Sequence, residues 1–175
     1  MLTKFIIPII GLKIGEHEFK WKVDGEFFKE FDCSELNNGD IDVILTLVKK
    51  LNLIELYFQT NGHVSCPCDR CAGDLILSFN HNEMRVVKFS SRNQIDTEDF
   101  IVLGNDEQEI DVSHMVYETI VLGLPARRAH GENLNTQKCD SDILSRLEMF
   151  EERKKNTIVD SRWSALNKLL TDKDK

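Results

Sequence analysis

Three of the chain's five cysteines lie in one short stretch, Cys66-Pro67-Cys68-Asp69-Arg70-Cys71, between two runs that alternate like strands. Cys68 and Cys71 have the C-x2-C spacing with which a tight turn aims two sulfur atoms at one tetrahedral ion. Thiolates are preferred ligands of Zn2+, so the stretch predicts half of a zinc site. The pattern constrains the fold, because the other half must come from a distant part of the chain.

The remaining ligands must come from a short list of cysteines and histidines. We favour His130 and Cys139, because both lie in one loop, residues 125–140, which can fold back onto the turn. Cys66 is an additional thiol, and it leaves open which two sulfur atoms of the stretch bind the metal. The other candidates are Cys33, His17, His63, His81 and His114.

Buried free cysteines are also common as small apolar side chains, and this is the simplest alternative to a metal site. We prefer zinc, because paired thiols at this spacing in a reducing compartment usually hold a ligand. Four protein ligands leave no open coordination position. The predicted zinc is therefore structural rather than catalytic.

Composition limits the class of protein. The 175 residues are 41% hydrophobic and 30% charged, which is typical of one globular domain with a real core. The net charge of −8 argues against coating nucleic acid by bulk attraction, so any RNA contact is expected to be local.

Pro8 and Lys13 interrupt the apolar N-terminus, which argues against a signal peptide, and no run is long enough to span a bilayer. Clustered cysteines in odd number favour the cytoplasm.

Period-two alternation predicts strands in the first part of the chain. Phe27, Phe28 and Phe31 fit either a helical turn or a twisted strand. The segment 90–109 is acidic and is predicted to be a solvated loop with one short strand. Turns are expected at 37–40, Asn61-Gly62 and 80–82. The expected strands are 5–12, 18–23, 43–47, 54–58, 75–79, 84–89 and 100–103.

From Asp111 onward the apolar period becomes helical. A first helix, capped by Asp111 or Ser113, is predicted to bury Val112, Met115, Val116 and Ile120 and to stop at Pro125. A second, capped by Asp140 or Ser141, is predicted to bury Ile143, Leu144, Leu147 and Phe150, and a third, short helix follows Asp160. Strands before helices predict an α+β fold. We expect an antiparallel β-sheet or partly closed barrel in the N-terminal part and three helices in the C-terminal part, within a single domain, 1–175, that is mainly β over 1–103 and mainly α over 111–170.

A series of short motifs follows in order along most of the chain from about Asp40. They are Gly62-His63-Val64, the stretch from Cys68 to Cys71, Ile110-Asp111-Val112, Tyr117-Glu118-Thr119-Ile120, Leu122 to Pro125, His130, Cys139 and Asp160-Ser161-Arg162-Trp163-Ser164-Ala165-Leu166. Their order and spacing resemble the YceD-like family, also known as domain of unknown function 177, the large ribosomal RNA subunit accumulation proteins. Many relatives carry a proline where this chain has Ser161.

The resemblance implies a role in accumulation or processing of large-subunit (23S) ribosomal RNA in the bacterial cytoplasm, with no reaction assigned. It supports treating Cys68, Cys71, His130 and Cys139 as one set. The implied protein is a non-enzymatic ribosome-assembly factor. Its expected partner is a ribosomal RNA precursor or a ribosomal or assembly protein, with no membrane and no small-molecule substrate.

Candidate residues for RNA or protein binding are Arg127, Arg128, Arg162 and Trp163. Guanidinium groups suit phosphate, and an indole suits base stacking. The simpler interpretation is that Trp163 anchors the core and that the paired arginines form a solvated edge.

The alternative function is that of a thiol redox protein using the Cys-x-x-Cys pair. It is disfavoured because that motif normally follows a strand and opens a helix, whereas here it lies between two predicted strands. A hydrolase would need a metal-bound water and a base. The nearby acids, Asp69 and Asp74, are more simply turn residues.

Overall fold

The computed structural model describes residues 2–31, 35–36, 38–90, 101–104, 107–132 and 137–155. The chain divides into two units, Met1–Lys138 and Cys139–Lys175. The expectations for Cys33, Arg162, Trp163 and a helix after Asp160 lie outside the described residues.

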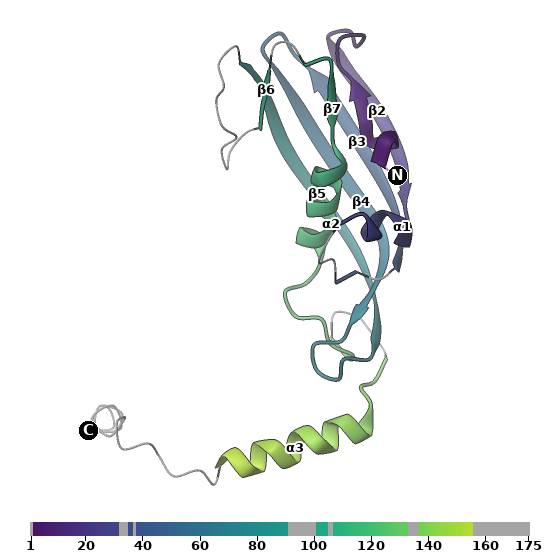
Figure 1. The fold of residues 1–175 in the computed structure, drawn as a ribbon, viewed down its shortest axis with the longest axis vertical. Helices are drawn as coiled ribbons and strands as arrows, with labels where there is room; N and C mark the ends of the chain where they lie inside the picture. The colour runs from purple at the N-terminus through teal and green to yellow at the C-terminus, as the bar shows by residue number, and fades with distance from the viewer. Residues whose placement is uncertain are drawn as a thin grey trace, which may run out of the picture. The chain divides into compact units, whose positions relative to one another are not determined.

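A five-stranded sheet is the frame of the first unit (Figure 1). Strands β2 to β5 pair antiparallel with their sequence neighbours, and β6 runs parallel to β5. The order β2-β3-β4-β5-β6 leaves the sheet open rather than closed into a barrel. The strands are β2 (Gly15–Val23), β3 (Asn38–Lys49), β4 (Leu53–Pro67), β5 (Asp74–Ser90) and β6 (Ile101–Gly104).

One face of this sheet is apolar because successive side chains of a strand point to opposite faces. The apolar positions predicted for β3, β4 and β5 are almost all completely buried, which confirms the period-two prediction. Side chains between them face the opposite way and are exposed or half-buried. The buried set is Ile41, Val43, Leu45, Leu47, Ile54, Leu56, Phe58, Val64, Leu75 and Leu77.

Strands β4 and β5 are longer than predicted, with 15 and 17 residues. The turns expected at Asn61-Gly62 and at 80–82 are wrong, because the two strands pair without a break from Leu53 with Lys88 to Pro67 with Asp74. The strands continue because the apolar alternation resumes on the same face beyond these polar residues. A Cβ at Gly62 would lie 2.2 Å from the backbone oxygen of Asp40, so β3 and β4 approach too closely there for a larger residue.

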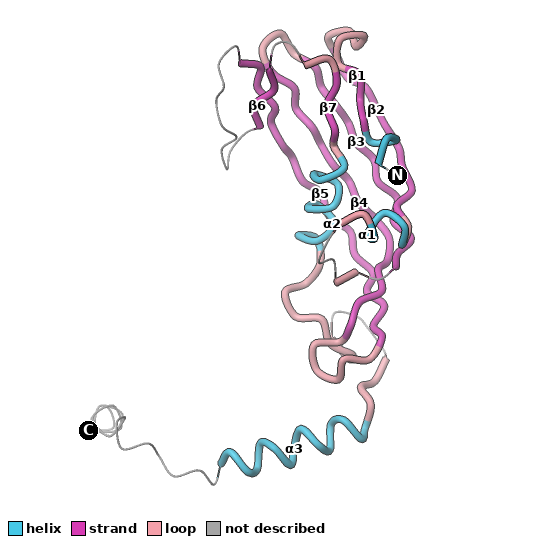
Figure 2. Tube along the Cα trace, in the orientation of Figure 1, coloured by secondary structure: helices cyan, strands magenta, loops and turns pink. Residues whose placement is uncertain are grey.

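A second layer covers the apolar face of the sheet (Figure 2). It comprises α1 (Gly25–Lys29), α2 (Ser113–Gly123), the 3-10 turn Leu2–Phe5, and a small antiparallel sheet of β1 (Ile6–Pro8) and β7 (Glu109–Asp111). The Asp24 carboxylate accepts hydrogen bonds from the backbone N–H groups of Glu26 and Phe27, which starts α1. Strand β7 was not predicted, because three residues are too few to show alternation.

Helix α2 confirms the predicted buried face: Val112, Met115, Val116 and Ile120 are at most 8% exposed. The predicted cap is wrong, because the N-cap is Val112, which makes no side-chain capping hydrogen bond. The Asp111 carboxylate just before it accepts a hydrogen bond from the Ser113 N–H at 2.8 Å. At the other end, a Cβ on Gly123 would lie 2.6 Å from the Cβ of His81 on β5. This close approach fixes where the chain leaves the helix toward His130.

The second unit contains α3 (Ser141–Lys155). The Asp140 carboxylate accepts hydrogen bonds from the N–H groups of Asp142 and Ile143, which confirms Asp140 as the cap. The predicted buried stripe is wrong, since Leu147 is 40% and Phe150 61% exposed. Helical periodicity shows that a face is apolar but does not show what covers it. The α+β class is confirmed, and within the described residues no helix has both the length and the hydrophobicity to cross a bilayer.

Candidate metal centre

The cysteine turn joins the end of β4 to the start of β5. The Cys68 N–H donates to the Gly73 carbonyl at 2.9 Å, and the Ala72 N–H donates to the Cys68 carbonyl at 2.8 Å. Ala72 has a φ of 56°, a left-handed conformation that lets so short a turn close. The turn buries both thiols, with Cys68 2% and Cys71 4% exposed.

The segment after α2 is held against this turn by two hydrogen bonds between Asp69 and the backbone of Arg128. The Asp69 N–H donates to the Arg128 carbonyl at 2.7 Å, and the Arg128 N–H donates to the Asp69 carboxylate at 2.6 Å. Two residues further on, His130 reaches the cysteines and is 8% exposed. Asp69 was predicted only as a turn residue. Its carboxylate is the feature that sequence reasoning missed, since nothing in the local pattern names a partner 59 residues away.

The ring of His130 is oriented by its two nitrogen atoms. Nε2 lies 3.0 Å from the Asp74 carbonyl, and because a carbonyl oxygen only accepts, Nε2 carries the proton and donates it. Nδ1 therefore faces the Cys71 Sγ, 3.3 Å away. A backbone carbonyl that fixes the ring of a metal-binding histidine in this way is a regular part of such sites.

Four potential ligand atoms meet at this point. They belong to Cys68, Cys71, His130 and Cys139, and all lie within 4.8 Å of one another. Three of the residues are buried and Cys139 is half-buried. Three sulfur atoms and one imidazole nitrogen form a Cys3His set, one of the usual ligand sets of a structural zinc site. The donors therefore fit zinc.

The electrostatics of the cluster favour a charged thiolate. Burial raises the pKa of Cys68, but hydrogen bonds from the backbone of Cys71, His130 and Arg70 outweigh it and lower the pKa to about 6. One of these donors is the Arg70 N–H, 3.5 Å from the Cys68 Sγ. The hydrogen bond to the Asp74 carbonyl, reinforced by the neighbouring thiols, raises the pKa of His130. The lowered pKa favours the thiolate form of Cys68 at neutral pH, which is the form that binds metal.

The remaining predicted candidates lie elsewhere or serve the fold. Cys66 is completely buried in β4, where burial raises the pKa of its thiol, and it is not in the cluster. The His17 ring contacts the Lys13 carbonyl at 2.8 Å, and the His114 ring meets the Phe31 ring edge-on at 5.1 Å between centroids. The turn thus contributes Cys68 and Cys71 and not the extra thiol.

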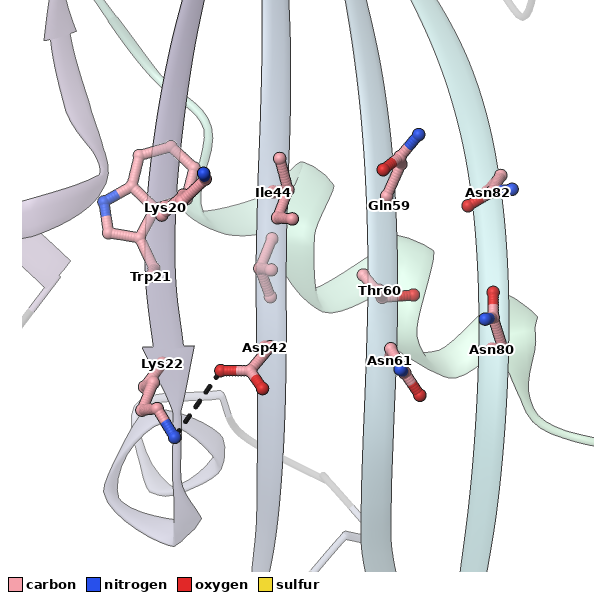
Figure 3. Close-up of a pocket in the computed structure, with 11 residues that line it drawn as sticks. Lys20, Trp21, Lys22, Asp42, Ile44, Gln59, Thr60, Asn61, Asn80 and Asn82 are labelled. Atoms are coloured by element: carbon pink, nitrogen blue, oxygen red, sulfur yellow. Dashed lines mark ion pairs between the residues drawn. The ribbon is translucent and has the colours of Figure 1, made fainter.

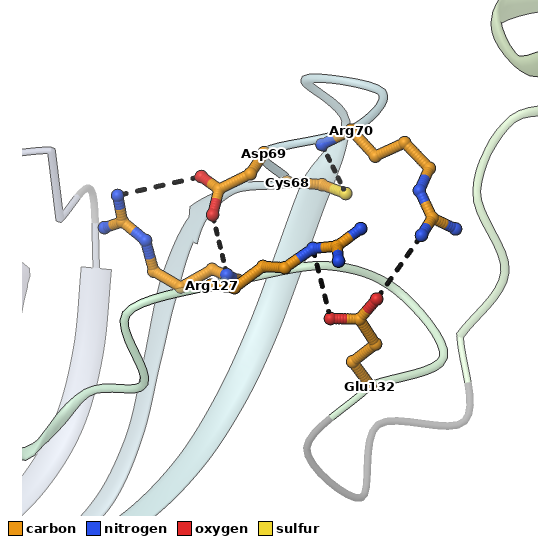
Figure 4. Close-up of polar contacts among 6 residues, drawn as sticks. Cys68, Asp69, Arg70, Arg127 and Glu132 are labelled. Atoms are coloured by element: carbon orange, nitrogen blue, oxygen red, sulfur yellow. Dashed lines mark hydrogen bonds and ion pairs between the residues drawn. The ribbon is translucent and has the colours of Figure 1, made fainter. Parts of the chain in front are cut away.

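Arginine side chains surround the cysteine turn (Figure 4). Arg128, 20% exposed, pairs with Glu35 and lies 3.8 Å from the Asp69 carboxylate. Arg127 is 64% and Arg70 39% exposed, and both pair with Glu132, at 3.4 and 3.3 Å. Arg70 was not among the predicted binding residues. Of the predicted arginines that the structure describes, Arg127 faces solvent and Arg128 mainly joins parts of the fold.

The position of the Cys-x-x-Cys stretch in the fold bears on the alternative of a thiol redox protein. The Cys-x-x-Cys stretch lies between β4 and β5, as predicted, and not at the start of a helix. A helix N-terminus is the feature that usually activates such a pair in thioredoxin-like proteins. Among the described residues, Cys66, Cys68, Cys71 and Cys139 form no disulfide bond.

The model of the family described as "Large ribosomal RNA subunit accumulation protein YceD" matches residues 56–170. Searches of curated proteins and of solved structures gave no match. The matched segment is more than half of the chain and includes both the cysteine turn and the segment that carries His130 and Cys139. The chain therefore belongs to the YceD family of large ribosomal RNA subunit accumulation proteins.

Proposed function

We propose that this protein is a non-enzymatic assembly factor that supports accumulation or processing of 23S ribosomal RNA, and that its Cys3His cluster binds one structural zinc ion. The observation that carries the proposal is that all four donors of the cluster lie inside the segment matched by the family model. The working location is the bacterial cytoplasm, where thiols stay reduced and able to bind metal.

The role of the zinc follows from its ligands. Cys68, Cys71, His130 and Cys139 fill a tetrahedral shell, so no position is left for a metal-bound water. The ion ties the β4–β5 turn to the segment after α2. The role of the ion is therefore structural: it keeps the surface around the cysteine turn in one conformation and does not catalyse a reaction.

The surface beside the zinc is the proposed partner site. Arg70 and Arg127 both face solvent and share Glu132, so a phosphate group can replace the carboxylate as their partner. Exposed ion pairs of this kind contribute little to stability and exchange readily. Arg128 has a structural role, since Glu35 and Asp69 occupy its guanidinium group. Arg162 and Trp163 stay predictions for the same partner, a ribosomal RNA precursor or a ribosomal protein.

The test is depletion of the protein, with precursor and mature large-subunit RNA measured beside sedimentation of a tagged copy with ribosomal particles. Depletion should lower mature 23S RNA, and a wild-type copy should restore it. A copy with Arg70→Glu and Arg127→Glu should restore it poorly, while Lys29→Glu, at an exposed position of α1, serves as the matched control. Normal RNA levels after depletion, together with no co-sedimentation, would rule the proposal out.

A thiol redox function is the second candidate, because a thiol with a pKa of about 6 is also reactive. Metal stoichiometry combined with thiol titration separates the two. One tightly held zinc with Cys68 and Cys71 protected from a thiol reagent supports the structural site. A reversible Cys68–Cys71 disulfide in protein without zinc supports the redox function.

A further inference from the structure

A hollow of about 670 Å3 lies on the face of the five-stranded sheet opposite α2. Figure 3 shows its residues on four neighbouring strands, with the helix behind the sheet. Polar side chains dominate the lining, with Lys20 and Lys22 on β2 and the remainder on β3, β4 and β5. These lining side chains all belong to the first unit.

Four carboxamide side chains form the centre of the hollow. Gln59 on β4 is paired in register with Asn82 on β5, and Asn61 is paired with Asn80. All four side chains are exposed. Directly paired residues on one face of a sheet have Cβ atoms about 5 Å apart, and same-face neighbours along a strand are about 7 Å apart. The four amides thus form a small two-by-two array.

The four carboxamides of the array take no part in the hydrogen bonding of the described fold. None of the four carboxamides has a hydrogen bond to another described residue. Asparagine is disfavoured inside strands, and these positions were predicted as turns for that reason. Three asparagines nevertheless stand in the middle of the two longest strands of the sheet. A sequence that departs from local preference without a structural gain marks a functional surface.

Two lysines border the array on the β2 side. The register places Lys20, Ile44, Gln59 and Asn82 in one row, and Lys22, Asp42, Asn61 and Asn80 in the next. The ion pairs of Lys22 are long, at 3.6 Å to Asp42 and 3.9 Å to Asp40, and its side chain is 75% exposed. Lys20 pairs with Glu18 at 2.6 Å, and both of these side chains are more than half exposed. Both ammonium groups can therefore turn to a phosphate.

We propose that this hollow binds a single-stranded segment of RNA, with the carboxamides bonded to base edges and Lys20 and Lys22 to phosphates. A carboxamide offers a donor and an acceptor side by side, which matches the edges of unpaired bases. The inference rests on the proposed function, because it names a second surface through which the same ribosomal RNA is held.

The chemistry of the hollow favours unpaired RNA over other occupants. An RNA duplex hides one set of base edges in a deep, narrow groove, and its shallow groove is recognised mainly through shape and 2′-hydroxyl contacts. Carboxamides that read base edges therefore favour unpaired bases. The centre of a protein interface is rich in aromatic and apolar anchors. Trp21 and Val43 also line the hollow, but within the two rows Ile44 is the one apolar side chain, which argues against a protein partner.

The experiment measures binding of a fluorescent, mixed-sequence single-stranded RNA of about 12 nucleotides to the full chain at several salt concentrations. The double variants Gln59→Ala with Asn82→Ala, and Asn61→Ala with Asn80→Ala, should each bind about tenfold more weakly with an unchanged salt slope. The variant Lys20→Gln with Lys22→Gln should reduce the slope of log affinity against log salt by about 1 to 2. An RNA duplex of the same sequence should bind more weakly than the single strand.

Matched controls separate the site from the fold. Asn52→Ala removes an exposed carboxamide in the turn between β3 and β4, outside the hollow, and should leave binding unchanged. Unaltered melting of all variants checks that the sheet remains folded. If both carboxamide variants bind RNA as tightly as the unaltered protein, the hollow is not the binding site. The ribosomal role is judged separately, by RNA levels after depletion.

Two further outcomes also overturn the proposal. If the unaltered protein binds none of the RNA probes, the hollow is not an RNA site. If the carboxamide variants bind RNA normally but no longer sediment with ribonuclease-treated particles, the occupant is a protein.

Discussion

At the residue scale, Cys71 and His130 are the pair that brings the two halves of the candidate zinc site together. Their Sγ and Nδ1 atoms are 3.3 Å apart although the residues are 59 positions apart in the chain. The buried thiol and the buried imidazole, which the Asp74 carbonyl orients, are both polar groups. Apolar packing therefore does not account for their contact. The proposed metal ion would account for both side chains being directed at one point.

Replacing Cys71 by serine should abolish tight zinc binding. The hydroxyl is a poor ligand for Zn2+, and the remaining three donors leave the shell incomplete. We expect zinc affinity to fall by more than about a hundredfold, as measured by competition with a chromogenic chelator. Cys66→Ala is the control, because Cys66 is a buried thiol outside the cluster. It should keep one zinc and lose about 1 kcal/mol of unfolding free energy. Equal zinc affinity in both variants would contradict the assignment.

Zinc affinity should also depend on pH, because the ligands bind as thiolate and neutral imidazole. The pKa of Cys68, about 6, means that protons begin to compete with zinc as the pH falls through that value. His130 has a raised pKa, so it holds its proton to higher pH than an ordinary histidine and adds to the competition. Affinity should therefore fall from about pH 8 to about pH 5. Chelator competition across this range is the measurement, and a flat profile is the result that disagrees.

At the scale of elements, the β4–β5 turn and the segment after α2 are joined by Asp69 as well as by the cluster. Its N–H and carboxylate bond both backbone groups of Arg128, two residues before His130. These hydrogen bonds hold His130 beside the cysteine turn before any metal is bound. Preorganised ligands bind metal more tightly, because less chain has to be ordered on binding.

Asp69→Ala should weaken zinc binding about tenfold without removing a ligand, since the loss falls on the positioning of His130. Asp74→Ala is the matched control. Asp74 lies in the same turn region, but its backbone carbonyl and not its side chain accepts the hydrogen bond from His130. Zinc titration of the two variants is the measurement. If Asp74→Ala were as damaging as Asp69→Ala, the carboxylate contact would have no special role.

At the scale of the whole molecule, the zinc should stabilise one region more than the sheet. The core of β3, β4 and β5 is completely buried and paired over long registers. The segment 125–132 contains no helix or strand and depends on Asp69 and the cluster. Local stability differs across a protein when contacts are distributed in this way.

Exhaustive chelation should therefore raise backbone hydrogen exchange in 125–132 and in the turn 68–73 well before it does so in β3. The expected change is about tenfold or more in the exposed segments, together with a lower melting temperature. Adding zinc back should reverse both changes, which distinguishes metal loss from damage to the protein. An unchanged exchange pattern and melting temperature after chelation would show that the cluster holds no structural metal.

Several features of this protein were predictable from local patterns. Alternation along Val43, Leu45 and Leu47 predicted a strand, and helical spacing from Val112 to Ile120 predicted a helix. The C-x2-C spacing predicted a turn with two thiols directed alike. Each prediction depends on a period or spacing that a window of a few residues already contains. The single-domain boundary at 1–175 stays a prediction.

Tertiary structure alone decided which distant groups meet. Asn61 and Asn80 have the local signature of turns, yet pairing over the full length of β4 and β5 keeps them in strands. The partner of Asp69, and the exposure of Leu147 on α3, are likewise absent from any local pattern. The amino-acid sequence by itself determined the periods of the elements and the kinds of ligand available. Long-range strand pairing and side-chain packing selected the rest, because their free energy comes from contacts between segments and not from preferences within one.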